Sequence, residues 1–549
     1  MFAGTNSTDI PARCWHHRLK LVLVTCGFAC VVLLATWTSH RKDSSILDDR
    51  QLLRTEELSN SSLLQAPATP RRFQCIGWRA TRRCSPDGPR DLQNDKDCSE
   101  IIDNSMSGYC EIEDLDTGER LQVMRRHCDG LQRNVSFRCS QAPFFANYHV
   151  EAQAVTEKAL VENFTLPHVT LDGRASRDGI VMVVYPKLLV SAYATIRVLR
   201  EVLKCRLPIE VWFHVDEIKG DYTLLKPLQQ LAMFVGRISF HPIYNPRAEG
   251  FLSKIFAIYN SYFDRVLFLD ADNVPVRDPS FLFKSSEFEA TGAVFWPDLW
   301  HPQRTLFNVH ARSMLWELLD IPFVDMFEQK SGQLLVDRSR HAAPLELVYF
   351  YAFHEPNYFE SLQLVHGDKD LFRLAWIKSG ATYHMMEALP ALAGKDVDGS
   401  FCGMTMVQHD AEGNILFLHR DQHKLTGERG NTGNRDFNGS ESQMVEDEDV
   451  PPDSYPDPII WTHLLSFSKD ANRSFYLIDA YRASPQFPQR QLCYGRRFET
   501  ERQHFELQEF SSFSFAGIET DLRHFAKEAA DLQRELHPVR GGDVFVGDP

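Results

Sequence analysis

The sequence has no excess of basic residues, and this absence narrows the class of protein. Among its 549 residues, 59 are Lys or Arg and 74 are Asp or Glu, which gives a formal net charge of −15. A protein that binds nucleic acid normally needs a basic face to meet the phosphate backbone. We therefore expect no nucleic-acid partner.

Several motifs of well-defined chemistry are also missing. Nothing in the sequence resembles an H-E-x-x-H or a Ser-His-Asp arrangement, which speaks against a hydrolase. The spacings of the cysteines include no C-x-x-C pair, so a zinc site is the weaker interpretation of them. No internal repeat is evident, and the composition is that of an ordinary globular protein with one large domain or two smaller ones.

A long hydrophobic run is present near the N-terminus. Residues 19–38 contain Lys20 as their only charged residue and are long enough to cross most of a hydrocarbon core. A cleaved signal peptide would have a shorter apolar region and a small-residue cleavage site. We therefore expect a signal anchor with residues 1–18 as a cytosolic tail, and hence a single-pass type II protein of the Golgi membrane, or alternatively of the ER membrane.

The cysteines after this run predict an oxidising compartment. A dense group of even number lies within 71–140 and predicts a small disulfide-rich module, although its connectivity stays open. Cys402 and Cys493 are a possible further bridge, and Cys205 is expected as a buried thiol. The role of the module is open between lectin-like or partner binding and a structural function. Its cysteines are Cys75, Cys84, Cys98, Cys110, Cys128 and Cys139.

Glycosylation sequons and low-complexity segments complete the expected layout. Residues 39–70 are polar and predict a flexible stem, whereas 426–458 predict an acidic loop. Residues 459–549 are expected to extend the catalytic domain and to end in an amphipathic helix over 518–536. N-x-S/T sequons on the expected luminal side occur at Asn60, Asn134, Asn163, Asn438 and Asn472.

From residue 179 onward the pattern is that of an α/β protein. A short apolar run at 180–185 is followed by a helical pattern from 192 and by a second apolar run at 209–215. Strand, helix and strand within so few residues form a βαβ unit, which predicts parallel strands. Further strands are expected at 238–243 and 265–269.

The strand at 265–269 ends in the triplet Asp270-Ala-Asp272. Ligands of open α/β sheets lie beyond the carboxyl ends of the strands, so these carboxylates are expected at a binding site. Hard oxygen ligands suit Mg²⁺ or Mn²⁺, which usually share carboxylates with substrate phosphates. The alternative is a pair of turn-forming aspartates. Most of the other Asp-x-Asp triplets in the chain are interpreted as surface charges.

Three other segments fit the same site. Lys254 opens a helix expected over 251–262 and is a candidate to meet a phosphate. The segment 328–333 precedes a strand-like run, and 366–370 precedes a helix with acidic residues at its start. A strand at 415–419 ends in His419, a plausible third metal ligand beside Asp272, with Lys424 five residues further on.

These motifs resemble those of a known family. The run 250–279, with Leu-Phe-Leu-Asp-Ala-Asp-Asn at its centre, closely resembles the fungal-type α-mannosyltransferases of the Golgi, glycosyltransferase family 71. Shorter segments resemble the other motifs of that family in the same order, and the match spans roughly 175–425. These segments are Phe295-Trp-Pro-Asp298, Ser331-Gly-Gln-Leu-Leu-Val-Asp337, Gly367-Asp-Lys-Asp370 and Phe417-Leu-His419.

The resemblance implies a GT-A fold, a Mn²⁺ or Mg²⁺ ion, a GDP-mannose-like donor and retention of the anomeric configuration. The metal ligands would be Asp272 and His419, with Asp270 on the metal or on the donor. The other implied roles are phosphate neutralisation by Lys254 and Lys424, and contacts to the transferred sugar by Gln333, Asp298, Asp368 and Asp370. The acceptor would be a glycan or glycoprotein.

Two alternatives stay open on the sequence alone. A transferase that uses a UDP-sugar would need nearly the same metal site, since similarity of fold does not determine a substrate. A non-catalytic, membrane-anchored carbohydrate-binding protein would need neither the aspartates nor the lysines of that site. The joint presence of Asp270, Asp272, His419 and Lys424 argues against the second alternative.

Overall fold

The computed structural model describes residues 69–103, 105–170, 176–305, 307–428, 454–483 and 492–536. The chain divides into two compact units, Met1–Thr69 and Pro70–Pro549. The predicted tail, membrane span and most of the stem, with Asn60, Asn438 and most of the acidic loop, lie outside the described residues. Within the described ranges, no helix has the length and apolar character needed to span a bilayer.

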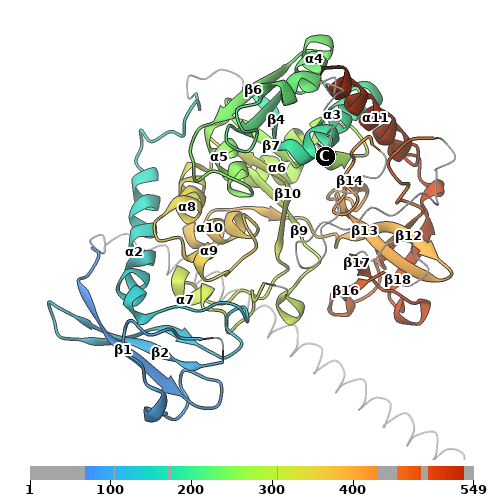
Figure 1. Cartoon of the computed structure of the whole chain (residues 1–549). Helices are drawn as coiled ribbons and strands as arrows, with labels where there is room; N and C mark the ends of the chain where they lie inside the picture. The colour runs from blue at the N-terminus through green and yellow to red at the C-terminus, as the bar shows by residue number, and fades with distance from the viewer. Residues whose placement is uncertain are drawn as a thin grey trace, which may run out of the picture. The chain divides into compact units, whose positions relative to one another are not determined.

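A seven-stranded mixed sheet forms the centre of the larger unit (Figure 1). Its strand order is β11-β9-β10-β7-β4-β5-β6, in which β4, β5, β6 and β7 are parallel and β10 runs antiparallel to both β7 and β9. The predicted α/β class is thus confirmed. The strands are β4 (Asp178–Val183), β5 (Ile209–His214), β6 (Ile238–Ile243), β7 (Arg265–Leu269), β9 (Ala293–Pro297), β10 (Gln329–Asp337) and β11 (His384–Met385).

Both faces of this sheet are buried, which explains the uninterrupted apolar runs of its strands. Along β7, Val266 and Phe268 face one side while Leu267 and Leu269 face the other. Figure 1 shows helices covering both faces. On the Phe268 side lie α2 (Ala142–Ala159), α5 (Leu252–Asn260), α8 (Ala342–Phe353) and α10 (Leu371–Ser379), and on the Leu269 side lie α3 (Leu189–Arg197), α4 (Lys226–Val235) and α11 (Ile518–Leu536).

A second, antiparallel sheet follows in the chain and is tied to the first region by one short strand pair. Strand β14 (Ile415–His419) pairs with both β13 and β8 (Asn273–Pro275), which directly follows the Asp270 triplet. The remaining strands have the order β16-β17-β13-β12-β15-β18. They are β12 (Ala391–Val397), β13 (Ser400–His409), β15 (His463–Phe467), β16 (Asp479–Arg482), β17 (Leu492–Gly495) and β18 (Phe505–Glu509).

The C-terminal amphipathic helix has the predicted bounds and packs on α3. Its Glu528 accepts a hydrogen bond from the hydroxyl of Tyr193 at 2.7 Å and pairs with Arg197, whose guanidinium lies over the ring of Phe525. The C-terminal extension is therefore part of the same body. Three short helices complete the fold: α6 (Ser286–Thr291), α7 (Leu315–Leu319) and α9 (Tyr358–Ser361).

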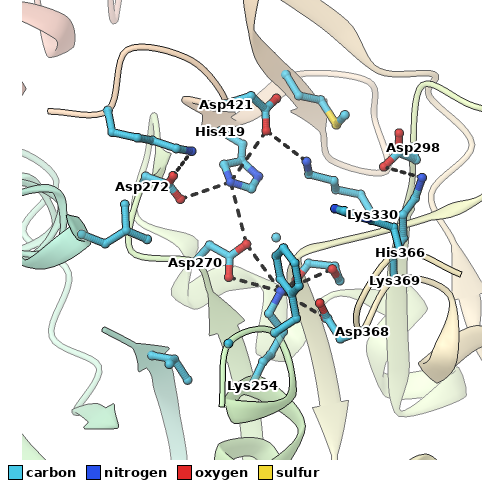
Figure 2. Close-up of a pocket in the computed structure, with 18 of the residues that line it drawn as sticks. Lys254, Asp270, Asp272, Asp298, Lys330, His366, Asp368, Lys369, His419 and Asp421 are labelled. Atoms are coloured by element: carbon cyan, nitrogen blue, oxygen red, sulfur yellow. Dashed lines mark hydrogen bonds and ion pairs between the residues drawn. The ribbon is translucent and has the colours of Figure 1, made fainter. Parts of the chain in front are cut away.

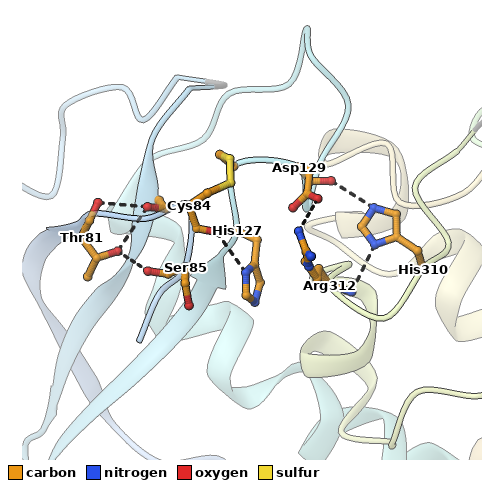
Figure 3. The surroundings of a disulfide bond; sticks show 9 residues. Thr81, Cys84, Ser85, His127, Asp129, His310 and Arg312 are labelled. Carbon is orange, nitrogen blue, oxygen red and sulfur yellow. Dashed lines mark hydrogen bonds and ion pairs between the residues drawn. A yellow bond between two sulfur atoms is a disulfide. The ribbon is translucent and has the colours of Figure 1, made fainter. Parts of the chain in front are cut away.

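The cysteine-rich segment folds as a three-stranded antiparallel sheet of β1 (Phe73–Thr81), β2 (Ser107–Asp114) and β3 (Arg120–Arg126). The predicted disulfide framework is confirmed, and its connectivity is Cys75–Cys98, Cys84–Cys128 and Cys110–Cys139. Figure 3 shows Cys84 beside His127, whose Nδ1 lies 3.2 Å from the Cys84 carbonyl oxygen.

This segment is less independent than the sequence suggested. Trp78 and Ile112 belong to the same continuous core as Phe145 of α2 and Tyr351 of α8. The apolar side of the small sheet is therefore covered by the larger body, so its stability rests on shared packing as well as on its bridges.

A fourth disulfide and a buried free thiol lie in the larger body, outside the cysteine-rich segment. The possible Cys402–Cys493 bridge is present and joins β13 to β17, and Cys205 is a buried free thiol. Burial raises the pKa of Cys205 to about 12, so this thiol is unreactive at neutral pH. The segment 329–333, expected to precede a strand, is the first half of β10 itself.

Candidate functional site

A cavity of about 550 Å³ lies where the carboxyl ends of the central strands meet the second sheet. This is the place at which open α/β sheets bind ligands. Figure 2 shows its charged side chains converging from separate segments of the chain. Six carboxylates and four lysines line it, so the cavity carries a formal excess of two negative charges. The predicted residues among them are Lys254, Asp270, Asp272, Asp298, Asp368, His419 and Lys424.

Two backbone features bring Asp270, Asp272 and His419 together. The amide of Asp270 donates to the carbonyl of Gly332 at 2.9 Å, which continues the β7–β10 ladder by one residue. The pairing of β8 with β14 then sets His419 opposite Asn273, next to Asp272. The His419 Nε2 atom lies 3.1 Å from Asp272 Oδ1 and 3.8 Å from Asp270 Oδ2.

These three side chains fit a divalent cation. One ligand atom from each lies within 4.8 Å of the other two, and both Asp272 and His419 are buried. Two carboxylates and an imidazole are a donor set that suits Mn²⁺, with Mg²⁺ less suited to the imidazole. Burial by itself would raise the pKa of Asp272, but Lys424 and His419 outweigh it and hold that pKa well below its usual range. The carboxylate is therefore ionised, as a metal ligand must be.

Gly332 is the residue that allows this approach. A Cβ atom at this position would lie 2.4 Å from His419 Nδ1 and 3.3 Å from Asp270 Oδ2. Such contacts are too short for carbon, so any side chain would displace the imidazole. The glycine of the segment 328–333 thus serves the close approach of β10 to the end of β14.

Lys254 joins two carboxylates of the cavity. Its Nζ atom lies 3.2 Å from Asp270 Oδ1, 3.1 Å from Asp368 Oδ2 and 2.8 Å from the carbonyl oxygen of Ser331. Burial alone would lower the pKa of Lys254, but the two carboxylates more than offset it and raise that pKa. All three ammonium donors therefore have partners, and the geometry gives Lys254 a positioning role rather than that of a free phosphate ligand.

Asp298 is held from behind by a lysine that the sequence did not single out. The Lys369 Nζ atom lies 3.4 Å from Asp298 Oδ2 and 2.5 Å from Glu328 Oε2. Burial would lower the pKa of Lys369, but Asp298 and Glu328 raise it overall. Lys369 lies between the predicted Asp368 and Asp370, and no periodicity distinguished it from a surface lysine.

A second missed pair is Lys330 with Asp421, whose side chains lie 3.2 Å apart beside His419 (Figure 2). Burial would raise the pKa of Asp421, but Lys330 and His419 lower it overall. Asp421 stands two residues after His419 and Lys330 stands within the segment 328–333. The only indication in the sequence that these two residues belong to the site was their proximity to those motifs.

Two predicted sugar contacts are not on the wall of the cavity. Asp370 is 1% exposed, pairs with Arg373 at 2.8 Å and accepts from the amide of Gln329. Gln333 is fully buried, and its Oε1 accepts from Asn273 Nδ2 at 2.7 Å. Both support the site from behind, because their strand or helix turns these side chains into the core.

Comparisons with known proteins agree with this geometry. Residues 177–410 match the family model described as "Mannosyltransferase putative". The chain is 27% identical over 346 residues to the α-1,2-mannosyltransferase MNN21 of Candida albicans, covering 53% of this chain and 51% of that protein. It is 26% identical over 197 residues to the α-1,2-mannosyltransferase MNN2 of Saccharomyces cerevisiae, covering 30% and 33%. The chain thus spans about half or less of the length of these relatives.

Similarity to solved structures is low. The mannosyltransferase Ktr4p from S. cerevisiae matches with a TM-score of 0.25 and 13% identity, over 42% of this chain and 75% of that one. Mouse xyloside xylosyltransferase 1 matches with a TM-score of 0.27 and 14% identity, over 38% and 84%. The description of the fold therefore rests on the strand order given above.

Fold and site together define an α/β protein with an acidic, lysine-bridged cavity at the carboxyl ends of its strands. The central part of the chain is similar in sequence to the fungal Mnn-like mannosyltransferases. The resemblance read from the motifs around Asp270 and His419 is thereby confirmed.

Proposed function

We propose that this protein is a mannosyltransferase that moves mannose from GDP-mannose to a glycan acceptor, with retention of configuration. The observation that carries the proposal is the charge of the strand-end cavity. Each of its four lysines already contacts a carboxylate, and two negative charges remain in excess. A diphosphate would be repelled there unless a divalent cation entered with it, which favours a metal-dependent nucleotide-sugar enzyme.

Asp270, Asp272 and His419 would hold that ion. When bound, Mn²⁺ supplies the positive charge that stabilises a departing diphosphate. The residues around the ion have complementary tasks. Lys254 keeps Asp270 and Asp368 apart at fixed positions, and Lys424 keeps Asp272 ionised.

The donor would lie between this centre and the wall formed by the end of β4. Val183, Tyr185 and Leu188 give that wall an apolar surface suited to a nucleobase. Asp298 and Asp368 also line the cavity, where they would accept hydrogen bonds from the hydroxyl groups of the sugar. In the reaction, the bond from the sugar carbon to the phosphate oxygen breaks, the acceptor oxygen bonds to that carbon, and the acceptor proton passes to the departing diphosphate.

The layout of the chain supports a secretory location. Four disulfides are typical of an oxidising compartment. We propose that residues 19–38 anchor the protein in the Golgi membrane with the body on the luminal side. The sequons at Asn134, Asn163 and Asn472 lie on exposed residues, as glycosylation there requires.

A donor panel tests this function. The full chain, purified from an oxidising secretory host, is incubated with α-mannoside acceptors and either GDP-mannose or UDP-sugars, in Mn²⁺ or in EDTA. We expect release of nucleotide from GDP-mannose alone, lost in EDTA, and an α-linked product by NMR. Release from a UDP-sugar would overturn the donor, and turnover undiminished in EDTA would overturn the metal dependence.

A further inference from the structure

A second cavity, of about 1110 Å³, opens next to the strand-end cavity. The two cavities share one stretch of wall, so a ligand in the second would lie against residues that also line the first. The shared residues are Glu217, Gly250, Phe251, Phe307 and His366. The volume exceeds the range of about 300–1,000 Å³ that is typical of small-molecule sites, which suits a ligand of several rings.

The shared wall is aromatic. The ring of Phe307 stacks on His366 with centroids 4.5 Å apart, and Phe251 lies against the same imidazole at 5.2 Å. Phe251 is nevertheless 56% exposed, so part of its ring is open to a ligand in the cavity. A Cβ at Gly367 would lie 2.5 Å from the Phe251 ring, so the glycine admits this packing. Exposed aromatic faces of this kind pack against the C–H face of a pyranose.

The rest of the wall is acidic and amide-rich. It presents the carboxylates of Glu249, Glu355 and Glu360 but a single arginine, Arg247, which pairs with Glu355 at 2.7 Å. Carboxylates accept hydrogen bonds from hydroxyl groups and repel anions. This chemistry fits a neutral oligosaccharide and excludes a phosphorylated one.

Glu217 stands at the junction of the two cavities with part of its hydrogen-bonding capacity unused. Its Oε1 accepts from the amide of Gly250 at 2.8 Å, which fixes the carboxylate in place. Its Oε2 is buried and has no hydrogen-bond partner among the described residues. A buried carboxylate oxygen without a partner is unfavourable, so a ligand hydroxyl entering here would gain a strong acceptor.

The cysteine-rich segment supplies one edge of this cavity through Gln132 and Asn134. These residues lie in the loop between Cys128 and Cys139, and a disulfide holds each end of that loop, to Cys84 and to Cys110. Asp129 at the start of the loop pairs with Arg312 of the body at 2.7 Å, as Figure 3 shows. The bridges therefore place a loop at a functional surface.

We infer that the second cavity is the acceptor site, that it binds a neutral α-mannoside oligosaccharide over Phe251 and Glu217, and that the cysteine-rich segment forms part of it. This inference rests on the proposed function. It also assigns a role to the segment, which the sequence alone left open between binding and a structural function.

Binding of α-mannotriose to the full chain, measured by saturation-transfer NMR without donor, tests the inference separately from turnover. We expect Phe251→Ala and Glu217→Gln each to weaken binding roughly tenfold. Glu412→Gln, an exposed carboxylate in a turn outside both cavities, should bind as the wild type does. Unchanged binding in both cavity variants would overturn the inference, as would preference for a basic peptide over the trisaccharide.

A pair of disulfide variants tests the part assigned to the loop. Replacing Cys84 and Cys128 by Ser frees one end of the loop, whereas replacing Cys75 and Cys98 frees a bridge elsewhere in the same small sheet. We expect weaker trisaccharide binding only in the first pair. Equal binding in the two pairs would contradict the loop's role, and Gln132→Ala gives the same test should the first pair fail to fold. Absence of nucleotide release in the donor panel would refute the proposed function and leave these binding results standing.

Discussion

The two cavities share a wall but are built in different ways. The strand-end cavity is lined by buried charges that arrive from β7, α5, β10 and β14, and each of its lysines contacts a carboxylate. The larger cavity is walled by loops and short helices around 246–252, 354–367 and the disulfide-held loop, with exposed aromatic and acidic side chains. The first arrangement is preorganised for one charged ligand, and the second offers a broad surface for a neutral one.

This difference shows which part of the molecule determines which property. Ionic groups that stand at strand ends and pair with one another have little freedom to move, so the reacting centre tolerates little change. Loops around Phe251 can vary in length and composition while the strands stay as they are. Within one fold, we therefore expect the chemistry to depend on the strand ends and the choice of acceptor to depend on the loops.

The largest expected effect is that of Asp272→Asn. Removing one charged ligand from the centre should lower mannosyl transfer on the order of 10³-fold with every acceptor. Nucleotide release at saturating Mn²⁺ measures it. The matched control is Asp398→Asn in another Asp-x-Asp triplet, where the backbone is left-handed and the residue is exposed. Equal rates in the two variants would show that Asp272 is not part of the metal centre.

Gly332→Ala should have the next largest effect. The added Cβ would displace His419 and leave both aspartates in place, so metal affinity should fall about 10–100-fold, the range seen when a group that orients a metal ligand is changed. The Mn²⁺ dependence of turnover measures the loss. Gly517→Ala, where a Cβ meets nothing within 4 Å, is the control. An unaltered Mn²⁺ dependence would show that His419 is not a ligand.

Folding stability should depend on pH through a carboxyl group at the contact between the cysteine-rich segment and the body, away from the metal site. Glu317 of α7 accepts from the amide of Arg125 on β3, and burial raises its pKa to about 7 from an ordinary value of 4.5. Because the folded pKa is the higher one, this group's stability contribution is complete below pH 4.5 and is lost as the pH rises through 7.

Glu317→Gln keeps the hydrogen-bond acceptor and removes the ionisation. It should therefore be more stable than the wild type at pH 8 by on the order of 2 kcal/mol and no more stable at pH 4. Denaturation midpoints at the two pH values measure this difference. A gain of the same size at both values would assign the effect to packing instead of titration.

The smallest expected effect concerns the sequon on the edge of the larger cavity. Ser136→Ala removes the Asn134 sequon without changing the wall residue itself. We expect the loss of one glycan by mass spectrometry and a fall of less than about fivefold in the KM for a trisaccharide acceptor. The KM for GDP-mannose should stay the same. If the glycan is lost and the KM stays the same for acceptors of every length, the glycan at Asn134 does not affect access of the acceptor.

The same contrast explains how far the sequence could predict the molecule. Strands β7 and β14 have the bounds that the sequence predicted, because buried strands leave an unbroken hydrophobic signature, and the edge strand β6 has its predicted bounds although it is only partly buried. Asp270, Asp272 and His419 stand at the ends of such strands, so their convergence followed from topology. The pairing of cysteines also needed the fold, since spacing alone leaves many connectivities open.

The sequence could not predict which way individual side chains point or which loops line a cavity. Asp370 and Gln333 belong to the right segments, yet one packs against Arg373 and the other against Asn273, which depends on rotation within a helix and a strand. Phe251 begins a predicted helix and Glu217 lies in a loop, and nothing in the sequence indicates that the two side chains line one cavity. Residues in loops lack the hydrophobic periodicity by which helices and strands are predicted, so a cavity lined by loops cannot be predicted in this way.

The most direct test of the central claim is a titration of the full chain with Mn²⁺ in the presence of GDP, followed by electron paramagnetic resonance. The claim is that Asp270, Asp272 and His419 form one ion-binding centre. It predicts a single bound Mn²⁺ per chain that is absent in Asp272→Asn and present in Asp398→Asn. The same bound Mn²⁺ in both variants, or none in the wild type, would contradict it.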